Sequence, residues 1–153
     1  MNTLPRHLLA SVAYRLDKAL AGSDASFTGY SPGKEVRTPL ELINHLVNLL
    51  SLMEAELMET ERIHWQTCSL KEGQEQFHFV AEEIEHFLEF NEVDEELLKL
   101  LLQGPLSDML THIGQLAMMR RLSGKPVQKE NFMKARIDLQ RKRRMQAQHV
   151  SGS

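Results

Sequence analysis

The chain has 153 residues, a net charge of -3 and a single cysteine. This length suits one domain, over residues 1–153, with its own hydrophobic core, and one cysteine excludes an internal disulfide framework. The first residues lack the uninterrupted apolar core of a secretory signal, and no apolar run approaches the length that spans a membrane. We therefore expect a soluble, cytoplasmic protein.

Apolar residues recur at helical spacing along the chain, and no convincing alternating strand is present. We therefore expect an all-α fold. Glycines and prolines mark the boundaries between the helical segments. In chain order, the pattern predicts helices over about residues 5–20, 39–61 and 74–91, a short helix over 94–102 ending at Gly104 and Pro105, a helix from Pro105 to Gly124, and a last helix over 129–146, with 147–153 as a disordered tail.

The helix that begins near residue 39 has a well-defined start. Thr38 can cap it, Pro39 suits the first helical position, and Glu41 completes a capping box. This helix carries His45, which is flanked by leucines. Spacing alone leaves His45 open to two interpretations, a half-buried histidine or a ligand.

A second histidine lies in the segment GPLSDMLTHIGQLAMMRRLSGKP, over residues 104–126. Asp108 and His112 are one helical turn apart in it, with side chains about 5–6 Å apart at Cβ, so one metal ion can join both. A third ligand has to come from elsewhere in the fold, and His45 is the best candidate. The sequence therefore suggests a metal site made of His45, Asp108 and His112.

A capped helix with one histidine, followed by a later helix with H-x-G-Q and an arginine-flanked L-x-G, resembles the DinB-like (YfiT-like) family of metal-binding helix bundles. The resemblance implies a four-helix bundle with short accessory helices, often a homodimer, and metal ligands at His45, position 108 and His112. The chain departs from the family pattern at Asp108, where histidine is usual, and at Ile113, where arginine is common.

Two imidazoles and one carboxylate suit a divalent metal ion, zinc or nickel first, and also iron or manganese. The resemblance implies a metal-dependent enzyme, either a thiol-dependent S-transferase or a hydrolase. Its partners would be a small thiol and an electrophilic small molecule. The alternative is a noncatalytic metal-binding or stress-related interaction protein.

Periodicity by itself favours another interpretation of the helix with Asp108 and His112. Its polar residues form one strip, which is typical of a solvent-facing surface. We expect Arg120 to face water, which would turn the strip with Asp108 and His112 toward the interior. Gln115 is then expected to support a ligand, and Gly114 to permit a close helix approach.

Other pairs of residues that could form a metal or catalytic site are weaker candidates. Glu61 with His64 and Glu83 with His86 have the Glu-x-x-His spacing of di-metal bundles, but His86 points away from the apolar stripe of its helix. His64 and Cys68 would be one turn apart only if that segment were helical. The basic run over residues 141–144 is a weak motif, and we expect neither nucleic acid nor a membrane as partner.

Overall fold

The computed structural model describes residues 1–139, and within them it is all helical with no strand, which confirms the all-α expectation. No helix in this part of the chain has both the length and the apolar character needed to cross a bilayer. The α-helices are α1 (Thr3–Leu20), α2 (Pro39–Met58), α3 (Leu70–Phe90), α4 (Glu95–Leu101) and α5 (Ser107–Leu122).

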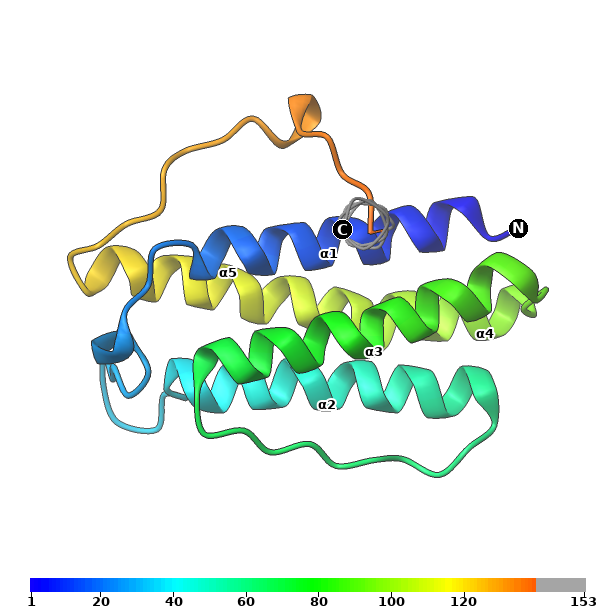
Figure 1. Cartoon of the computed structure of the whole chain (residues 1–153), viewed down its shortest axis with the longest axis horizontal. Coiled ribbons are helices and arrows are strands. Elements are labelled where there is room, and N and C mark those ends of the chain that lie inside the picture. Colours follow the sequence, from blue (N-terminus) through cyan, green and yellow to red (C-terminus); the bar gives the residue numbers. More distant parts are fainter. Residues whose placement is uncertain (140–153) are drawn as a thin grey trace, which may run out of the picture.

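The four long helices form a bundle (Figure 1). α1 packs against α3 and α5, and α2 packs against the same two helices. The colour sequence in Figure 1 shows that α1 and α5 run in one direction, whereas α2 and α3 run in the other. Each helix therefore has one parallel and one antiparallel neighbour, so α2 and α3 must be joined by a segment that returns along the bundle.

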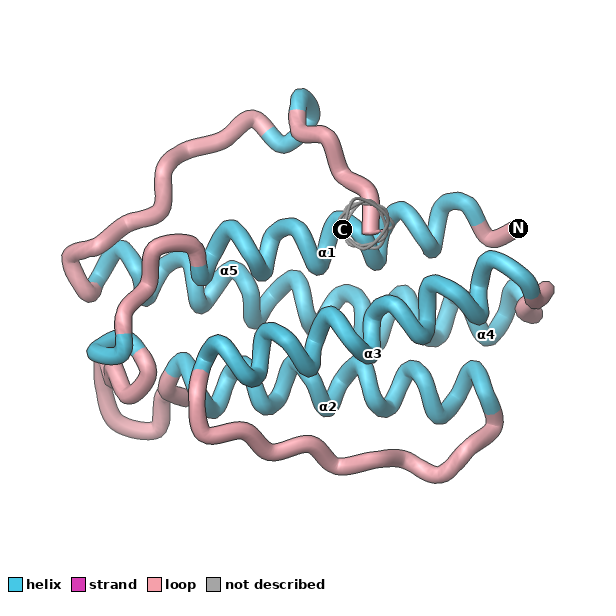
Figure 2. Tube along the Cα trace, in the orientation of Figure 1, coloured by secondary structure: helices cyan, strands magenta, loops and turns pink. Residues whose placement is uncertain are grey.

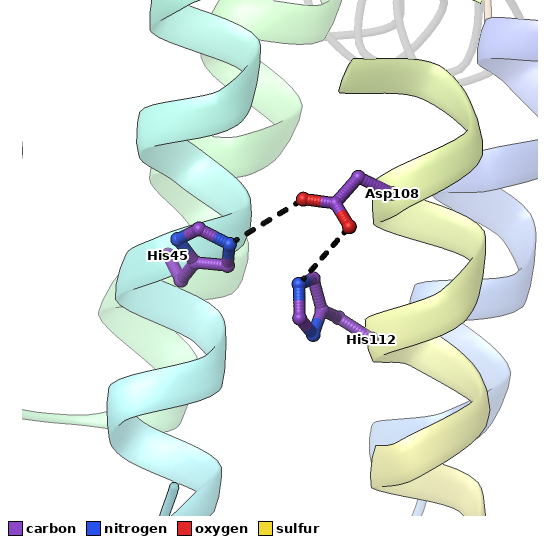
Figure 3. Close-up of side chains that lie close together, drawn as sticks. All are labelled: His45, Asp108 and His112. Atoms are coloured by element: carbon purple, nitrogen blue, oxygen red, sulfur yellow. Dashed lines mark ion pairs between the residues drawn. The ribbon is translucent and has the colours of Figure 1, made fainter. Parts of the chain in front are cut away.

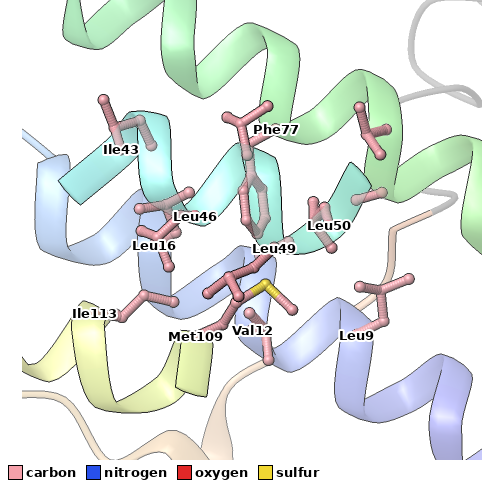
Figure 4. Packing of buried hydrophobic residues seen from close by; sticks show 14 of the residues in the cluster. Leu9, Val12, Leu16, Ile43, Leu46, Leu49, Leu50, Phe77, Met109 and Ile113 are labelled. Atoms are coloured by element: carbon pink, nitrogen blue, oxygen red, sulfur yellow. The ribbon is translucent and has the colours of Figure 1, made fainter. Parts of the chain in front are cut away.

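Apolar side chains at helical spacing fill the centre of the bundle (Figure 4). Fully burying each large side chain contributes roughly 1.5–3 kcal/mol, so this core is the main source of stability. The largest fully buried side chains are Phe77, Leu9, Leu16, Leu42, Ile43, Leu46, Leu50, Met53, Ile84, Leu88, Met109 and Leu116.

α2 starts at the predicted residues, although the Glu41 carboxylate accepts from the Thr38 hydroxyl at 3.1 Å, where a full capping box would use the Thr38 backbone N–H. The Thr38 side chain accepts a hydrogen bond from the Glu41 backbone N–H at 3.2 Å, and Pro39 is the first helical residue. The helix ends at Met58, before the expected residue 61, because Glu59 takes a left-handed conformation with φ 53°. The cap at Thr38 and the left-handed residue at Glu59 together set where the helix that carries His45 begins and ends.

An extended segment over residues 59–69 returns the chain along α2 to the start of α3 (Figure 2). Asn44 and Asn48 hold it in place. Asn44 bonds the backbone N–H and C=O of Thr67, and Asn48 bonds those of Trp65, at 2.8–3.3 Å. Asn44 and Asn48 are four residues apart on a helix, a rise of about 6.0 Å. Thr67 and Trp65 are two residues apart on extended chain, a rise of about 6.6 Å. Because the two rises are nearly equal, each asparagine amide lies opposite one of these two residues.

The sequence predicts that one helix ends and the next begins at Gly104 and Pro105, and this prediction is wrong. A wider π-helical turn, Leu102–Leu106, joins α4 to α5 without a non-helical gap. Pro105 has no N–H to donate, and the wider turn accommodates its ring. The Ser107 hydroxyl donates to the Leu102 carbonyl at 2.6 Å, and the Ser107 backbone N–H bonds the same carbonyl, so both groups of Ser107 hold this turn against the start of α5.

The expected helix over residues 129–146 is wrong for 129–139, where the only helical element is the short 3-10 turn Phe132–Lys134. Ala135, Ile137 and Leu139 face the bundle while the residues between them are exposed. This alternation belongs to extended chain, because successive side chains then point to opposite sides. The remainder of that expected helix and the expected tail at 147–153 lie outside the described residues.

Candidate metal centre

His45 on α2 faces Asp108 and His112 on α5 across the bundle (Figure 3). His45 Nε2 lies 3.7 Å from Asp108 Oδ2, and His112 Nε2 lies 3.4 Å from Asp108 Oδ1. One ligand atom from each of the three residues lies within 4.8 Å of the other two. The expected approach of His45 to His112 is therefore confirmed.

The separations in this cluster differ from those of a hydrogen-bonded network. N–H···O hydrogen bonds are about 2.7–3.2 Å long, shorter than both nitrogen-to-oxygen distances here. Ligands bound at about 2.0–2.2 Å around a tetrahedral ion are about 3.3–3.6 Å apart. The two distances to Asp108 are close to that second range, so small side-chain movements would allow all three residues to share one ion.

His112 is the most buried member of the cluster, at 8% exposure. Its Nδ1 lies 3.0 Å from the side-chain oxygen of Gln115, one turn further along α5. A carbonyl oxygen accepts only from a protonated nitrogen, so Gln115 holds the proton on Nδ1 and leaves the Nε2 lone pair facing Asp108. Gln115 thus takes the supporting position expected of it, since it orients a candidate ligand.

His45 is half-buried, and its ring meets the His112 ring edge-on with centroids 4.6 Å apart. Burial lowers the pKa of His45, and the charge of Arg37, together with that of His112 whenever it is protonated, lowers it further, against the opposing effect of Asp108. A lowered pKa favours the neutral imidazole near neutral pH, which is the form that binds metals. Arg37 lies in the loop before α2, where no sequence pattern singled it out.

Asp108 completes the cluster at its open side, since 48% of its side chain is exposed. Its carboxylate adds the one negative charge of the three-residue set. Exposure keeps the carboxylate hydrated, while the two imidazoles behind it are more enclosed. The centre therefore combines a charged outer ligand with two inner nitrogens, and it is reachable from solvent.

A cavity of about 300 Å³ lies between the loop before α2 and the second half of α5, and none of the three candidate ligands is among its lining residues. Gln115, which contacts His112, and Arg37, which acts on His45, both line it. The rest of the lining is mostly apolar and includes Leu42, Met118 and Leu122. The cavity can hold an apolar group close to Gln115 and Arg37, the two residues that act on His112 and His45.

Two expectations about α5 are wrong. Arg120 is buried, at 4% exposure, and its guanidinium donates to the backbone carbonyls of Ala19, Ala21 and Lys125 at 2.7–3.0 Å. Its side chain bonds carbonyl groups at the C-terminal end of α1 and does not face water. The position of Arg120 therefore cannot explain why Asp108 and His112 face α2. Nor does Gly114 permit a close approach, because a Cβ there would meet nothing within 4 Å.

The competing clusters do not assemble in the described part of the chain. Glu61 and His64 lie on the extended segment and are exposed, and Cys68 is also exposed there. His86 lies on the exposed side of α3, away from the core, as its spacing predicts. Across residues 1–139, His45, Asp108 and His112 form the only group of three such ligands close enough to share an ion. The basic run 141–144 lies outside the described residues.

Fold and site together define an all-helical bundle with a candidate metal-ligand triad between two of its helices. Comparisons with models of protein families, with curated proteins and with solved structures gave no match. The function proposed next therefore rests on the geometry of the triad and on the resemblance in the sequence.

Proposed function

We propose that this chain is a DinB-like four-helix bundle that binds a divalent metal ion through His45, Asp108 and His112. We propose further that the centre serves a metal-dependent enzyme, a transferase or hydrolase that uses a small thiol. The observation that carries the proposal is the convergence of three ligand atoms, from α2 and α5, within 4.8 Å.

The donor set fits such an ion. Two imidazole nitrogens and one carboxylate oxygen suit zinc, nickel, iron or manganese, and three protein ligands leave coordination positions for a substrate. A divalent ion held there supplies a Lewis acid, which lowers the pKa of a thiol bound to it and favours the nucleophilic thiolate.

The protein residues prepare the site in complementary ways. Burial and Arg37 keep His45 neutral, and Gln115 keeps the Nε2 lone pair of His112 available. Asp108 balances part of the charge of a cation. In the transfer we propose, the thiol sulfur forms a bond to an electrophilic carbon, the leaving group departs with the bonding electron pair, and the thiol proton passes to solvent. The cavity lined by Met118 and Leu122 would hold the apolar part of that electrophile.

Metal titration of single variants tests the ligand set. His112→Ala should weaken binding strongly, and Asp108→Asn should weaken it less because an oxygen remains. Gln115→Leu should lower the affinity by about 10–100-fold, as for loss of a group that orients a ligand. His64→Ala is the matched control, an exposed histidine outside the triad, and should bind as wild type does. Equal affinity in wild type and His112→Ala would remove this histidine from the site.

An activity screen tests the reaction. Metal-loaded protein is mixed with several small thiols and a model electrophile, and thioether formation is followed with and without a chelator. We expect acceleration that the chelator abolishes and that His45→Ala lacks. Acceleration unaffected by both would exclude the mechanism. Metal binding without acceleration on any substrate would instead support the noncatalytic metal-binding role.

The sequence resemblance also leads us to propose a homodimer. Sedimentation equilibrium of the full chain tests it, with a dimer mass expected at micromolar concentration. A monomer mass over the whole concentration range would contradict this part of the proposal and leave the metal centre unaffected.

A further inference from the structure

A second cavity lies on the opposite side of α5 from the candidate metal centre. The chain leaves α5 and arches over α1 (Figure 1), enclosing about 730 Å³ between the arch and these two helices. Pockets that bind small molecules are commonly about 300–1,000 Å³. Helix residues advance by about 100°, so the lining residues Leu110 and Ala117 face away from Asp108 and His112. The proposed function makes no use of this cavity.

The arch over residues 125–134 is attached to α1 by specific contacts. The Tyr14 hydroxyl donates a hydrogen bond to the Glu130 carboxylate. The Arg15 guanidinium carbon lies 3.9 Å from the centre of the Phe132 ring, and the Tyr14 ring meets Phe132 edge-on. These contacts hold the outer wall in a defined position, so the cavity is built by side-chain interactions as well as by the path of the chain.

The lining combines an apolar floor with a basic rim. The floor is formed by α1 and α5, and includes Leu8, Leu110, Ile113 and Ala117. Four basic residues, Arg15, Lys18, Arg121 and Lys129, stand around it against one carboxylate, that of Glu130. The chain as a whole carries a net charge of -3, so this gathering of cations is local.

Two of these cations have no anionic partner in the described part of the chain. Glu130 is already bonded by Tyr14, and its other oxygen lies 3.8 Å from Lys18. Arg121 and Lys129 form no ion pair with any carboxylate of residues 1–139. Both side chains are exposed at the rim, where they can meet a bound anion. The guanidinium of Arg121 matches a carboxylate with two parallel hydrogen bonds.

We propose that this cavity binds a small anionic amphiphile, a carboxylate with an apolar body of medium length. The body would cover the floor formed by Leu110, Ile113 and Ala117, and the carboxylate would lie against Arg121 and Lys129. A neutral apolar molecule would leave the cations without a partner. A highly charged molecule would bring charge onto the apolar floor, at a cost in desolvation.

Calorimetric titration of the full chain with decanoate and with decanol tests the proposal, because the two share an alkyl chain and differ in charge. We expect decanoate to bind one molecule per chain and decanol to bind more weakly. Arg121→Gln should weaken decanoate by about three- to tenfold, as for loss of one charge-assisted hydrogen bond at an exposed site, and should leave decanol unchanged.

Two further variants locate the site. Gly114 lines the cavity with no atom within 4 Å of a Cβ, so Gly114→Leu should place a side chain over part of the floor and weaken decanoate binding without disturbing the fold. Lys99→Gln removes a basic residue beside a different apolar cavity near α4, and should bind decanoate as wild type does. Absence of decanoate binding would overturn the proposal. So would decanoate binding that is as tight in Gly114→Leu as in wild type, or that is lost in Lys99→Gln instead.

Discussion

Gly73, in the first turn of α3, lies against Ile43 of α2. A Cβ placed there would be 2.7 Å from Ile43 Cγ1, 3.0 Å from Ile43 Cγ2 and 3.2 Å from Thr67 Oγ1. Carbon atoms in favourable contact are about 3.5–4.0 Å apart, so Gly73→Ala would force neighbouring groups to move by up to about 1 Å. Ile43 is fully buried and has little room to do so.

The magnitude follows from two opposing effects. Overpacking a dense core costs about 1–3 kcal/mol, while alanine stabilises a helix over glycine by up to about 1 kcal/mol. Gly73→Ala should therefore destabilise the protein by about 0–2 kcal/mol. Gly114→Ala is the matched control, since its Cβ meets open space, and it should stabilise by about 0.5–1 kcal/mol.

Denaturant unfolding of both variants measures this contrast. At this chain length, about 2–4 °C of melting temperature corresponds to 1 kcal/mol, so thermal melts should separate the two variants by about 1–12 °C. Repeating Gly73→Ala in an Ile43→Ala background removes both contacted carbons, and most of its cost should disappear, with a coupling of about 0.5–3 kcal/mol. Equal stabilisation by Gly73→Ala and Gly114→Ala would refute the argument.

Three further predictions concern the connecting segment and two ionisable groups. Asn48→Ala should destabilise the protein by about 1–3 kcal/mol, because the Trp65 backbone loses both partners, and chemical denaturation measures it. Burial, together with the charge of Glu83, raises the pKa of Glu54. Glu54→Gln should therefore stabilise the fold at neutral pH, and denaturation at several pH values should show the gain vanishing below the ordinary value of 4.5. For His45, whose pKa is lowered, the metal-free wild type should lose stability relative to His45→Asn as pH falls below 6.5 through the folded pKa. Parallel stability curves for His45→Asn and wild type over that range would contradict the assignment.

The start of α2 and the Asp108–His112 pair could be predicted because their signals are local. Thr38 and Glu41 are three residues apart, and Asp108 and His112 are one turn apart, so backbone geometry alone decides whether they meet. The contribution of His45 depends on how α2 packs against α5. Periodicity could not provide that pairing, and the family resemblance was needed to suggest it.

Arg120 shows why other features could not be predicted. A charged residue is rarely buried without partners, so its position on a helix surface was the natural expectation. Its partners are backbone carbonyls of residues 19, 21 and 125. Every residue has a backbone carbonyl, so the sequence does not indicate which ones a side chain will bond. The pairing of Asn44 and Asn48 with the extended segment could not be predicted for the same reason, because both side-chain amides bond backbone groups.

The close approach of α2 and α3 illustrates a further limit. Gly73 and Gly114 both lie inside helices, and sequence alone gives no basis for telling which one a neighbour touches. The structure shows that Ile43 lies against Gly73, whereas the side of α5 at Gly114 faces a cavity. Which glycine matters is therefore a property of the tertiary packing.

Elemental analysis of the full chain, purified without a histidine tag, tests the central claim most directly. The account predicts one divalent metal ion per chain in wild type, retained in His64→Ala, lost in His112→Ala and released by acid as protons compete for the ligands. Wild type that stays metal-free after exposure to zinc, nickel, iron and manganese would contradict the account. So would the same metal content in wild type and His112→Ala.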